Sequence, residues 1–272
     1  GRVIGPGHAS IVEGPDGGDR TTVTATADPG TLGPVDLVVV FVKGHHTASA
    51  AGSITPLLGP RTLVLTLQNG WGNAHVLAAT LPSERIVMGV TYHSCSAVGP
   101  GHVRHTGRGP TVVGPYRGAH ESDAKAVAEF LTAAGWPAEA SAEVRTEIWK
   151  KLVLNAATLP TAALARLAAG DLVTEEPMRE LVDALATEAV AVARALGMDI
   201  DAAERIARIH AVLTGAGKGR ASMLQDVEAA RKTEIETVTG AVVAEGARAG
   251  VPTPLNRAMF ALVRGLERSF VR

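Results

Sequence analysis

Apolar residues in the first half of the chain form short, nearly continuous runs between turn residues. The clearest runs are "VDLVVVFVK" (35–43), "TLVLTLQNG" (62–70) and "RIVMGVTYHS" (85–94). Uninterrupted runs rich in β-branched residues are typical of parallel strands that are covered on both faces. Segments of helical or loop character, "HHTASAAGSITPLLG" and "NAHVLAATLP", separate the runs. This alternation predicts βαβ units.

The pattern changes after the third run. "GHVRHTGRGPTVVG" (101–114) predicts an antiparallel addition to the sheet, and "ESDAKAVAEFLTAAG" predicts an amphipathic helix that stops at Gly135. From about Val144 the strand signals end and helical periodicity takes over. The helical segments are 144–167, 175–197, 201–213, 222–250 and 256–269. We therefore predict an α/β domain over residues 1–140, followed by an all-α domain over residues 141–272.

A polar stripe runs along the first of these helical segments. Within the apolar stretch "WKKLVLNAATLP" (149–160), Lys151, Asn155 and Thr158 share one face, because positions i and i+4 are neighbours on an α-helix. Glu147 stands one turn upstream. Such a stripe is either a solvated edge or the lining of a cleft.

The overall composition narrows the class of protein. Lys+Arg number 26 and Asp+Glu 27, a formal net charge of -1, so we expect no surface for nucleic acid or anionic lipid. The longest apolar run, "VDLVVVFV", is too short to span a bilayer, and no secretory leader is visible. Cys95 is the only cysteine, which excludes an internal disulfide and makes the cytoplasm the default location.

Polar groups follow each of the three predicted strands: Lys43, "QNG" (68–70) and "YHS" (92–94). In open α/β sheets, ligands bind beyond the carboxyl ends of the strands. These groups are therefore candidates for a binding site. Ordinary loop chemistry is the alternative, since Asn-Gly is a common turn.

Several other segments do not fit the sites that they suggest. "GPGHAS" (5–10) lacks the preceding buried strand and the following helix of a dinucleotide fingerprint. "GAGKG" (215–219) is not a P-loop, because Val212 stands where the first glycine should be. His102 and His105 are three apart in a predicted strand and point to opposite faces, so we expect no metal site.

Two segments of the second half fit capping boxes, "SMLQ" with Ser222 at the N-cap and "TEIE" with Thr233. A helix N-terminus also receives a carboxylate well, so a binding role is compatible with capping. Glu234 would complement the helix dipole. Pro160 predicts a kink in the helix that carries Lys151.

Taken together, these segments resemble the ketopantoate reductase (2-dehydropantoate 2-reductase) family over nearly the entire chain. The matching segments are "VDLVVVFVK", "LQNGWGN", "GVTYHS", "GHVRHTGRG", "EIWKKLVLNAATLP", "SMLQDVEAARKTEIE" and "GVPTPLN". The resemblance implies a Rossmann-like N-terminal domain, a helical C-terminal domain and an active site between them. It also implies that NADPH supplies hydride to the ketone of a 2-oxo acid, 2-dehydropantoate or a related compound, in pantothenate biosynthesis.

The resemblance also implies roles for single residues. The catalytic residues would be Lys151, the proton donor, and Glu234. The substrate would contact Asn69, Asn155 and Ser222, of which Ser222 receives the carboxylate. The cofactor would contact Arg2, Lys43, Asn69, Cys95 and Glu234.

A lysine suits this reaction because hydride transfer leaves negative charge on the carbonyl oxygen, which an ammonium can stabilise and protonate. An apolar wall would lower the pKa of Lys151, whereas Glu234 would raise it. The sequence leaves open which effect is larger.

The sequence departs from the family in two places. The family's opening strand, GxGxxG turn, helix and second strand are missing, and Arg2 stands at the spacing of the basic residue that binds the 2'-phosphate of NADPH. Either the sequence is incomplete here or the protein has lost its usual cofactor site. Leu159 replaces a substrate-binding asparagine just before Pro160, which puts ketopantoate itself in question while a 2-oxo acid remains expected.

Two functions are therefore open. The first is an NADPH-dependent 2-oxo acid reductase, which the retained polar residues favour. The second is a catalytically silent binding or regulatory protein on the same fold without a cofactor, which the missing fingerprint favours. The expected partners are a small-molecule 2-oxo acid and, in a homodimer, a second copy of the chain, with no nucleic acid and no membrane.

Overall fold

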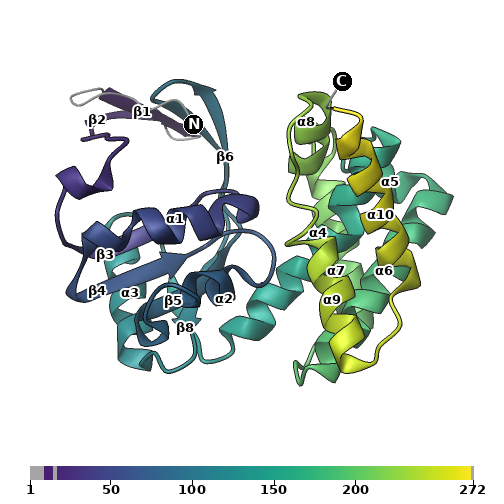
Figure 1. Ribbon diagram of the computed structural model, residues 1–272. Helices are drawn as coiled ribbons and strands as arrows, with labels where there is room; N and C mark the ends of the chain where they lie inside the picture. The colour runs from purple at the N-terminus through teal and green to yellow at the C-terminus, as the bar shows by residue number, and fades with distance from the viewer. Residues whose placement is uncertain (1–8, 15–16, 271–272) are drawn as a thin grey trace. The chain divides into compact units, whose positions relative to one another are not determined.

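The computed structural model describes residues 9–14 and 17–270, and the chain divides into two compact units (Figure 1). The first unit takes most of the chain up to Val144. The second unit begins at Arg145 and also takes in two short segments of the first half, residues 42–47 and 68–75. The predicted domain boundary at residue 140 stays a prediction.

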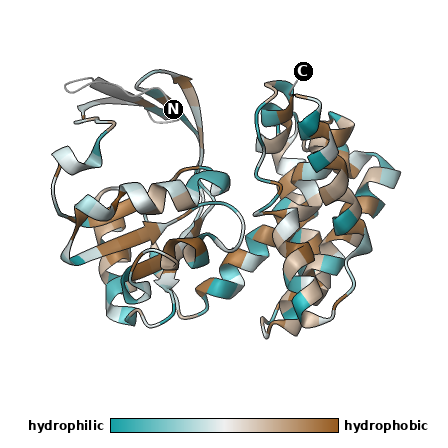
Figure 2. Cartoon of the chain, in the orientation of Figure 1, coloured by the Kyte–Doolittle hydropathy of each residue, from teal (hydrophilic) through white to brown (hydrophobic). Residues whose placement is uncertain are grey.

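The first unit contains a five-stranded sheet in the order β3-β4-β5-β8-β9. The strands are β3 (Val35–Val40), β4 (Leu58–Thr66), β5 (Ile86–Thr91), β8 (Thr111–Pro115) and β9 (Glu139–Ala140). The parallel strands β3, β4 and β5 are connected through α1 (Thr47–Ser53) and α2 (Asn73–Ala78), which confirms the predicted βαβ units. Figure 2 shows β4 and β5 in hydrophobic colours, as expected for covered strands.

One helix supplies much of the cover of this sheet. α3 (Glu121–Ala133) ends two residues before Gly135, close to the predicted stop. Its apolar face packs on residues from β4, β5 and β8. The buried cluster comprises Leu65, Leu67, Val87, Val113, Ala124, Val127, Ala128 and Leu131.

The predicted antiparallel addition at residues 101–114 is confirmed for β8, but the segment forms two strands in two different sheets rather than one addition. β8 pairs antiparallel with β5, whereas β7 (His102–Gly107) lies in a second sheet of order β2-β1-β7-β6. The other members of that sheet are β1 (Ala9–Gly14), β2 (Gly17–Thr22) and β6 (Ser94–Gly99). The break falls at "RGP", where Pro110 has no N–H for a strand ladder.

The second unit is helical, as predicted. Its helices are α4 (Val144–Ala165), α5 (Asp171–Thr174), α6 (Glu176–Ala195), α7 (Ala202–Ala216), α8 (Ser222–Glu228), α9 (Thr239–Ala249) and α10 (Pro254–Arg268). Residues 222–250 form two helices rather than one, since Ala230 adopts a left-handed φ of 49° that ends α8. The short helix α5 in "LAAGDL" was not predicted. In the part of the chain described, no helix is long and apolar enough to cross a membrane.

α4 lies at the centre of this unit's core. Its residues Trp149, Leu152 and Val153 are almost fully buried among residues of α6 and α7 such as Leu185 and Ile209. The helix continues through Pro160, and the predicted kink stays a prediction. Figure 1 shows α6, α9 and α10 side by side, and each of the three contacts the other two.

The two segments from the first half dock against the turn that precedes α9. The N–H of Trp71 donates to the carbonyl of Thr237 at 2.8 Å. A Cβ atom at Gly70 would lie 2.3 Å from that same carbonyl oxygen, and one at Gly44 would lie 2.6 Å from a methyl of Thr237. Both positions therefore require glycine, because the backbone at each lies too close to Thr237 for a side chain.

We predict that Gly70→Ala destabilises the protein more than Gly72→Ala. The two positions have similar left-handed backbones, with φ of 88° and 96°, so each alanine should cost about 1–2 kcal/mol. Only Gly70 has a neighbour within van der Waals contact, and overpacking there should cost about 1–3 kcal/mol more. Urea unfolding of both variants measures the difference, and equal losses would show that the contact with Thr237 carries no constraint.

Candidate functional site

The polar stripe of α4 meets the docked segment 68–75. The ammonium of Lys151 donates to Oδ1 of Asn69 at 2.8 Å. Asn155 is buried, and the hydroxyl of Thr158 donates to the carbonyl of Leu154 at 2.8 Å. The stripe therefore faces protein at Asn69, 82 residues away in the chain.

Glu147, one turn upstream of Lys151, also has a partner. Its carboxylate pairs with Lys150 at 2.8 Å. Residues i and i+3 are neighbours on a helix, and Lys150 lies about 100° round from Lys151. The two adjacent lysines consequently have different environments, one in an ion pair on the side of the helix and one against an amide.

Burial is the main influence on the pKa of Lys151. It lowers the pKa of Lys151 to about 8 from an ordinary value of 10.5, and the nearby Glu234 carboxylate opposes this shift without cancelling it. Both effects were expected, and desolvation is the larger one. An ammonium with this pKa can give up a proton near neutral pH far more readily than an exposed lysine.

Glu234 is held by the other docked segment. Its Oε1 accepts a hydrogen bond from the backbone N–H of Gly44 at 3.2 Å. Because Glu234 also acts on the charge of Lys151, the acid lies between the segment after β3 and the lysine of α4. The structure thus brings together three of the predicted residues, Asn69, Lys151 and Glu234.

Lys43 lies beside Gly44 but has its own partner. Its ammonium forms an ion pair with Asp226 of α8, whose side chain is only 6% exposed. The same carboxylate accepts from Nε of Arg231 at 3.1 Å. Asp226 was not singled out from the sequence, since 183 residues separate it from Lys43 and no local pattern links the two.

Ser222 is not an N-cap, so the predicted capping box is absent. It is the first residue of α8, Ala221 holds the N-cap position without a side-chain bond, and Gln225 donates to the carbonyl of Arg220 at 2.9 Å. α8 is seven residues long. Ser222 is exposed at the first position of this short helix.

The second capping box, at "TEIE", is also absent as a helix start. α9 begins only at Thr239. Thr233 instead accepts from the N–H of Ile235 at 3.1 Å and donates to Glu267 at 2.7 Å. Contacts with α10 have fixed this segment as a turn, and the turn carries Glu234.

The remaining predicted residues lie elsewhere. Cys95 is exposed in β6 of the first unit, opposite His105 of β7, and partial burial raises the pKa of its thiol. Arg2 lies outside the described residues. Within residues 9–14 and 17–270, no group of three or more metal-ligating side chains comes together; His102 pairs with Glu13, and His105 with His93 at 2.9 Å.

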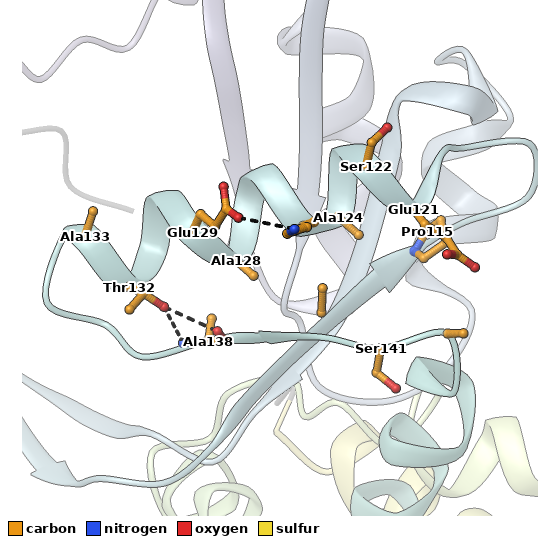
Figure 3. A pocket seen from close by; sticks show the side chains of 13 residues that line it. Pro115, Glu121, Ser122, Ala124, Ala128, Glu129, Thr132, Ala133, Ala138 and Ser141 are labelled. Carbon is orange, nitrogen blue, oxygen red and sulfur yellow. Dashed lines mark hydrogen bonds and ion pairs between the residues drawn. The ribbon is translucent and has the colours of Figure 1, made fainter.

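A hollow of about 850 Å³ lies on the first unit between α3 and the segment after it (Figure 3). Alanines dominate its lining, together with the exposed pair Lys125 and Glu129. None of the candidate residues lines it. Size alone does not make a site, because chemistry requires convergent polar groups, and the cluster around Lys151 supplies them.

Comparison with known proteins agrees with this grouping of residues. The family models "Ketopantoate reductase PanE/ApbA" and "Ketopantoate reductase PanE/ApbA C terminal" match residues 8–118 and 143–267. A curated 2-dehydropantoate 2-reductase from Halobacterium salinarum is 35% identical over 255 residues, 93% of this chain and 84% of the relative.

Solved structures give the same result. A ketopantoate reductase of the PanE/ApbA family from Ralstonia eutropha JMP134 is 35% identical, with a TM-score of 0.86 over 97% of this chain and 86% of that one. A D-mandelate dehydrogenase solved with NADH is 27% identical, with a TM-score of 0.82 over 86% of this chain and 80% of that one. The chain described here belongs to the ketopantoate reductase family of oxidoreductases.

Proposed function

We propose that this protein reduces a 2-oxo acid, 2-dehydropantoate or a related compound, to the 2-hydroxy acid with a nicotinamide cofactor. One observation carries the proposal: a desolvated lysine ammonium of lowered pKa, bonded to Asn69 and close to Glu234. The activity named for the relatives supports it. A binding protein without chemistry would have no use for a buried ammonium of this kind, since burying a charge is costly.

Lys151 would act on the carbonyl oxygen of the substrate. Reduction at the carbonyl carbon leaves negative charge on that oxygen, and an ammonium in a water-poor site stabilises this charge and transfers a proton to it. Asn69 orients the ammonium through its amide oxygen, and Glu234 keeps enough of the lysine protonated to act as an acid. The proton passes from Nζ of Lys151 to the alkoxide oxygen.

The described residues fit the reactive end of a nicotinamide cofactor. When bound, the cofactor supplies the hydride. Lys43 follows β3 and Asn69 follows β4, at the carboxyl ends of neighbouring parallel strands, which is where open α/β sheets bind ligands. We propose that Lys43, Asn69 and Glu234 face the nicotinamide half, that the backbone of Cys95 contacts the cofactor, and that Arg2 binds a 2'-phosphate.

The substrate carboxylate would be bound by Ser222, with Asn155 nearby on the stripe. Ser222 is exposed and is not the N-cap of α8, so its hydroxyl would donate to an anion. Asn155, one helical turn beyond Lys151, presents an amide on the same face. Together the two residues would set the ketone against the ammonium of Lys151.

We also propose that the protein works in the cytoplasm and as a homodimer. A single cysteine, which is free in the structure, fits a reducing compartment. The family resemblance is the basis for the dimer. Size-exclusion chromatography with light scattering measures the oligomeric state directly.

We predict that Lys151→Ala lowers kcat by about 10²–10⁴, the usual effect of removing a proton donor. Lys150→Ala is the matched control, because Lys150 is the adjacent lysine, points about 100° away round the helix and pairs with Glu147, and a surface pair of this kind contributes little. It should stay within about a few-fold of wild type. Steady-state kinetics, with circular dichroism to verify folding, decides between them, and equal losses would refute the assignment of Lys151.

We predict that ketone reduction slows as pH rises through about 8, the pKa of Lys151 in the folded protein. The acid must be protonated, so kcat/KM should be level below this pH and fall about tenfold per pH unit above it. Lys151→Arg should remove this limb, since a guanidinium stays protonated. A profile that begins to fall only near pH 10.5 would mean that the lysine is not desolvated in the working enzyme.

We predict tighter binding of NADPH than of NADH, because the guanidinium of Arg2 matches a phosphate through two hydrogen bonds. Titration of the full-length protein with each nucleotide measures the two dissociation constants. Arg2→Gln should weaken NADPH binding alone. Equal affinities in the wild type would exclude a role for Arg2, and binding of neither nucleotide would favour a protein without a cofactor.

A further inference from the structure

We infer that His93 and His105 are positioning residues for the cofactor, because their hydrogen bond fixes the start of β6, where Cys95 lies. This inference rests on the proposed function, in which the backbone of Cys95 contacts the cofactor. Neither imidazole is assigned a contact with the cofactor or the substrate. All three residues lie in the first unit, His93 just after β5, Cys95 in β6 and His105 in β7.

The backbone ladder between β6 and β7 is irregular at this point. Ser94 of β6 pairs with Gly107 of β7. Cys95, the next residue, pairs with His105, so Thr106 is left without an opposite residue. An extra residue of this kind disrupts the hydrogen bonds of a ladder and bends the strand. Side-chain contacts are therefore needed to fix the backbone where Cys95 lies.

Two side-chain hydrogen bonds supply such contacts. Nδ1 of His93 lies 2.9 Å from Nε2 of His105, and the two rings stack with centroids 5.0 Å apart. One ring donates in this bond and the other accepts. The hydroxyl of Thr106 donates to the carbonyl of Ser94 at 3.1 Å. Both bonds connect β7 to the chain at the start of β6.

His93 is also anchored to the five-stranded sheet. Its ring centroid lies 5.1 Å from that of Trp136, whose indole N–H donates to the hydroxyl of Thr111 in β8 at 2.8 Å. The backbone N–H of His93 donates to the hydroxyl of Thr91, the last residue of β5, at 3.2 Å. His93 thus contacts both sheets at the point where the chain passes from β5 to β6 (Figure 1).

The bond between the two imidazoles depends on pH. Burial lowers the pKa of His93 from its ordinary value of 6.5, and the charges of His105 and Arg108 lower it further. Trp136, which packs on the same ring, carries no charge. When both imidazoles are protonated, neither has an acceptor and the bond breaks. Because the fold disfavours protonation of His93, the bond is present above about pH 6.5 and is lost as the pH falls below it.

The first test measures the dissociation constant of NADPH for alanine variants by calorimetric titration. His93→Ala and His105→Ala should each weaken NADPH binding about two- to tenfold at neutral pH, the effect of one hydrogen bond. KM for NADPH should rise by the same factor, whereas kcat should change less, because the pair acts through the cofactor-binding backbone. His102→Gln is the matched control, since His102 also lies in β7 but pairs with Glu13, and it should bind NADPH as the wild type does.

The second test replaces the pair by groups that form a hydrogen bond but do not titrate. In the double variant His93→Asn, His105→Gln, the side-chain amides stand in for Nδ1 and Nε2. This variant should bind NADPH as the wild type does at neutral pH. At about pH 5.5 it should bind more tightly than the wild type, in which both imidazoles become protonated. Comparison at the same pH cancels the titration of the nucleotide's own phosphate.

Three results bear on the inference in different ways. Alanine variants that fold, as judged by circular dichroism, and bind NADPH as tightly as the wild type would overturn it. A double variant with the same pH dependence as the wild type would overturn it too, and this comparison decides alone if the alanine variants do not fold. A wild type that binds no nucleotide at any pH would refute the proposed function, and this inference with it.

Discussion

The site depends on the close fit of the turn before α9 against two glycines. Thr237 occupies the space that side chains at Gly44 and Gly70 would need, and the N–H of Trp71 bonds to its carbonyl. This fit places Gly44 under the carboxylate of Glu234 and places Asn69 beside Lys151. Residues from three distant parts of the sequence become one cluster because the backbones can approach so closely there.

The same region is reinforced by aromatic packing. The ring centroids of Trp71 and Trp149 lie 5.7 Å apart. Trp149 is fully buried in α4, two residues before Lys151. The indole N–H of Trp71 donates to Glu245 of α9 at 3.2 Å. One tryptophan thus connects the docked segment to both α4 and α9, and large aromatic contacts of this kind resist displacement. The Trp71–Trp149 contact thus lies beside the Asn69–Lys151 contact, two residues away in each segment.

Electrostatics in the cluster follows from what is buried with what. Desolvation favours the neutral form of Lys151, and Glu234 favours the charged form. Because desolvation is larger, the pKa of Lys151 is lowered to about 8. At the other docked segment a buried charge has partners of opposite sign. The carboxylate of Asp226 forms ion pairs with Lys43 and Arg231, so its negative charge is compensated.

The family resemblance in the sequence anticipated the membership that the comparisons establish. It also pointed to Lys151, Asn69 and Glu234, three residues that the structure brings together. Local sequence patterns predicted helix N-termini less well. The capping boxes at Ser222 and Thr233 failed because contacts with Arg220 and Glu267 fixed those segments differently.

The sequence by itself determined the order and type of most elements, because hydrophobic periodicity is a local property. It determined the βαβ units of the first half, the helices of the second, and the face of α4 on which Lys151 stands. Only the tertiary structure decided that "GHVRHTGRGPTVVG" divides between two sheets, that Lys43 pairs with Asp226, and that burial outweighs Glu234 at Lys151. Each of these depends on residues that are distant in the chain. A local sequence pattern does not show which distant residues come into contact or which side chains those contacts remove from water.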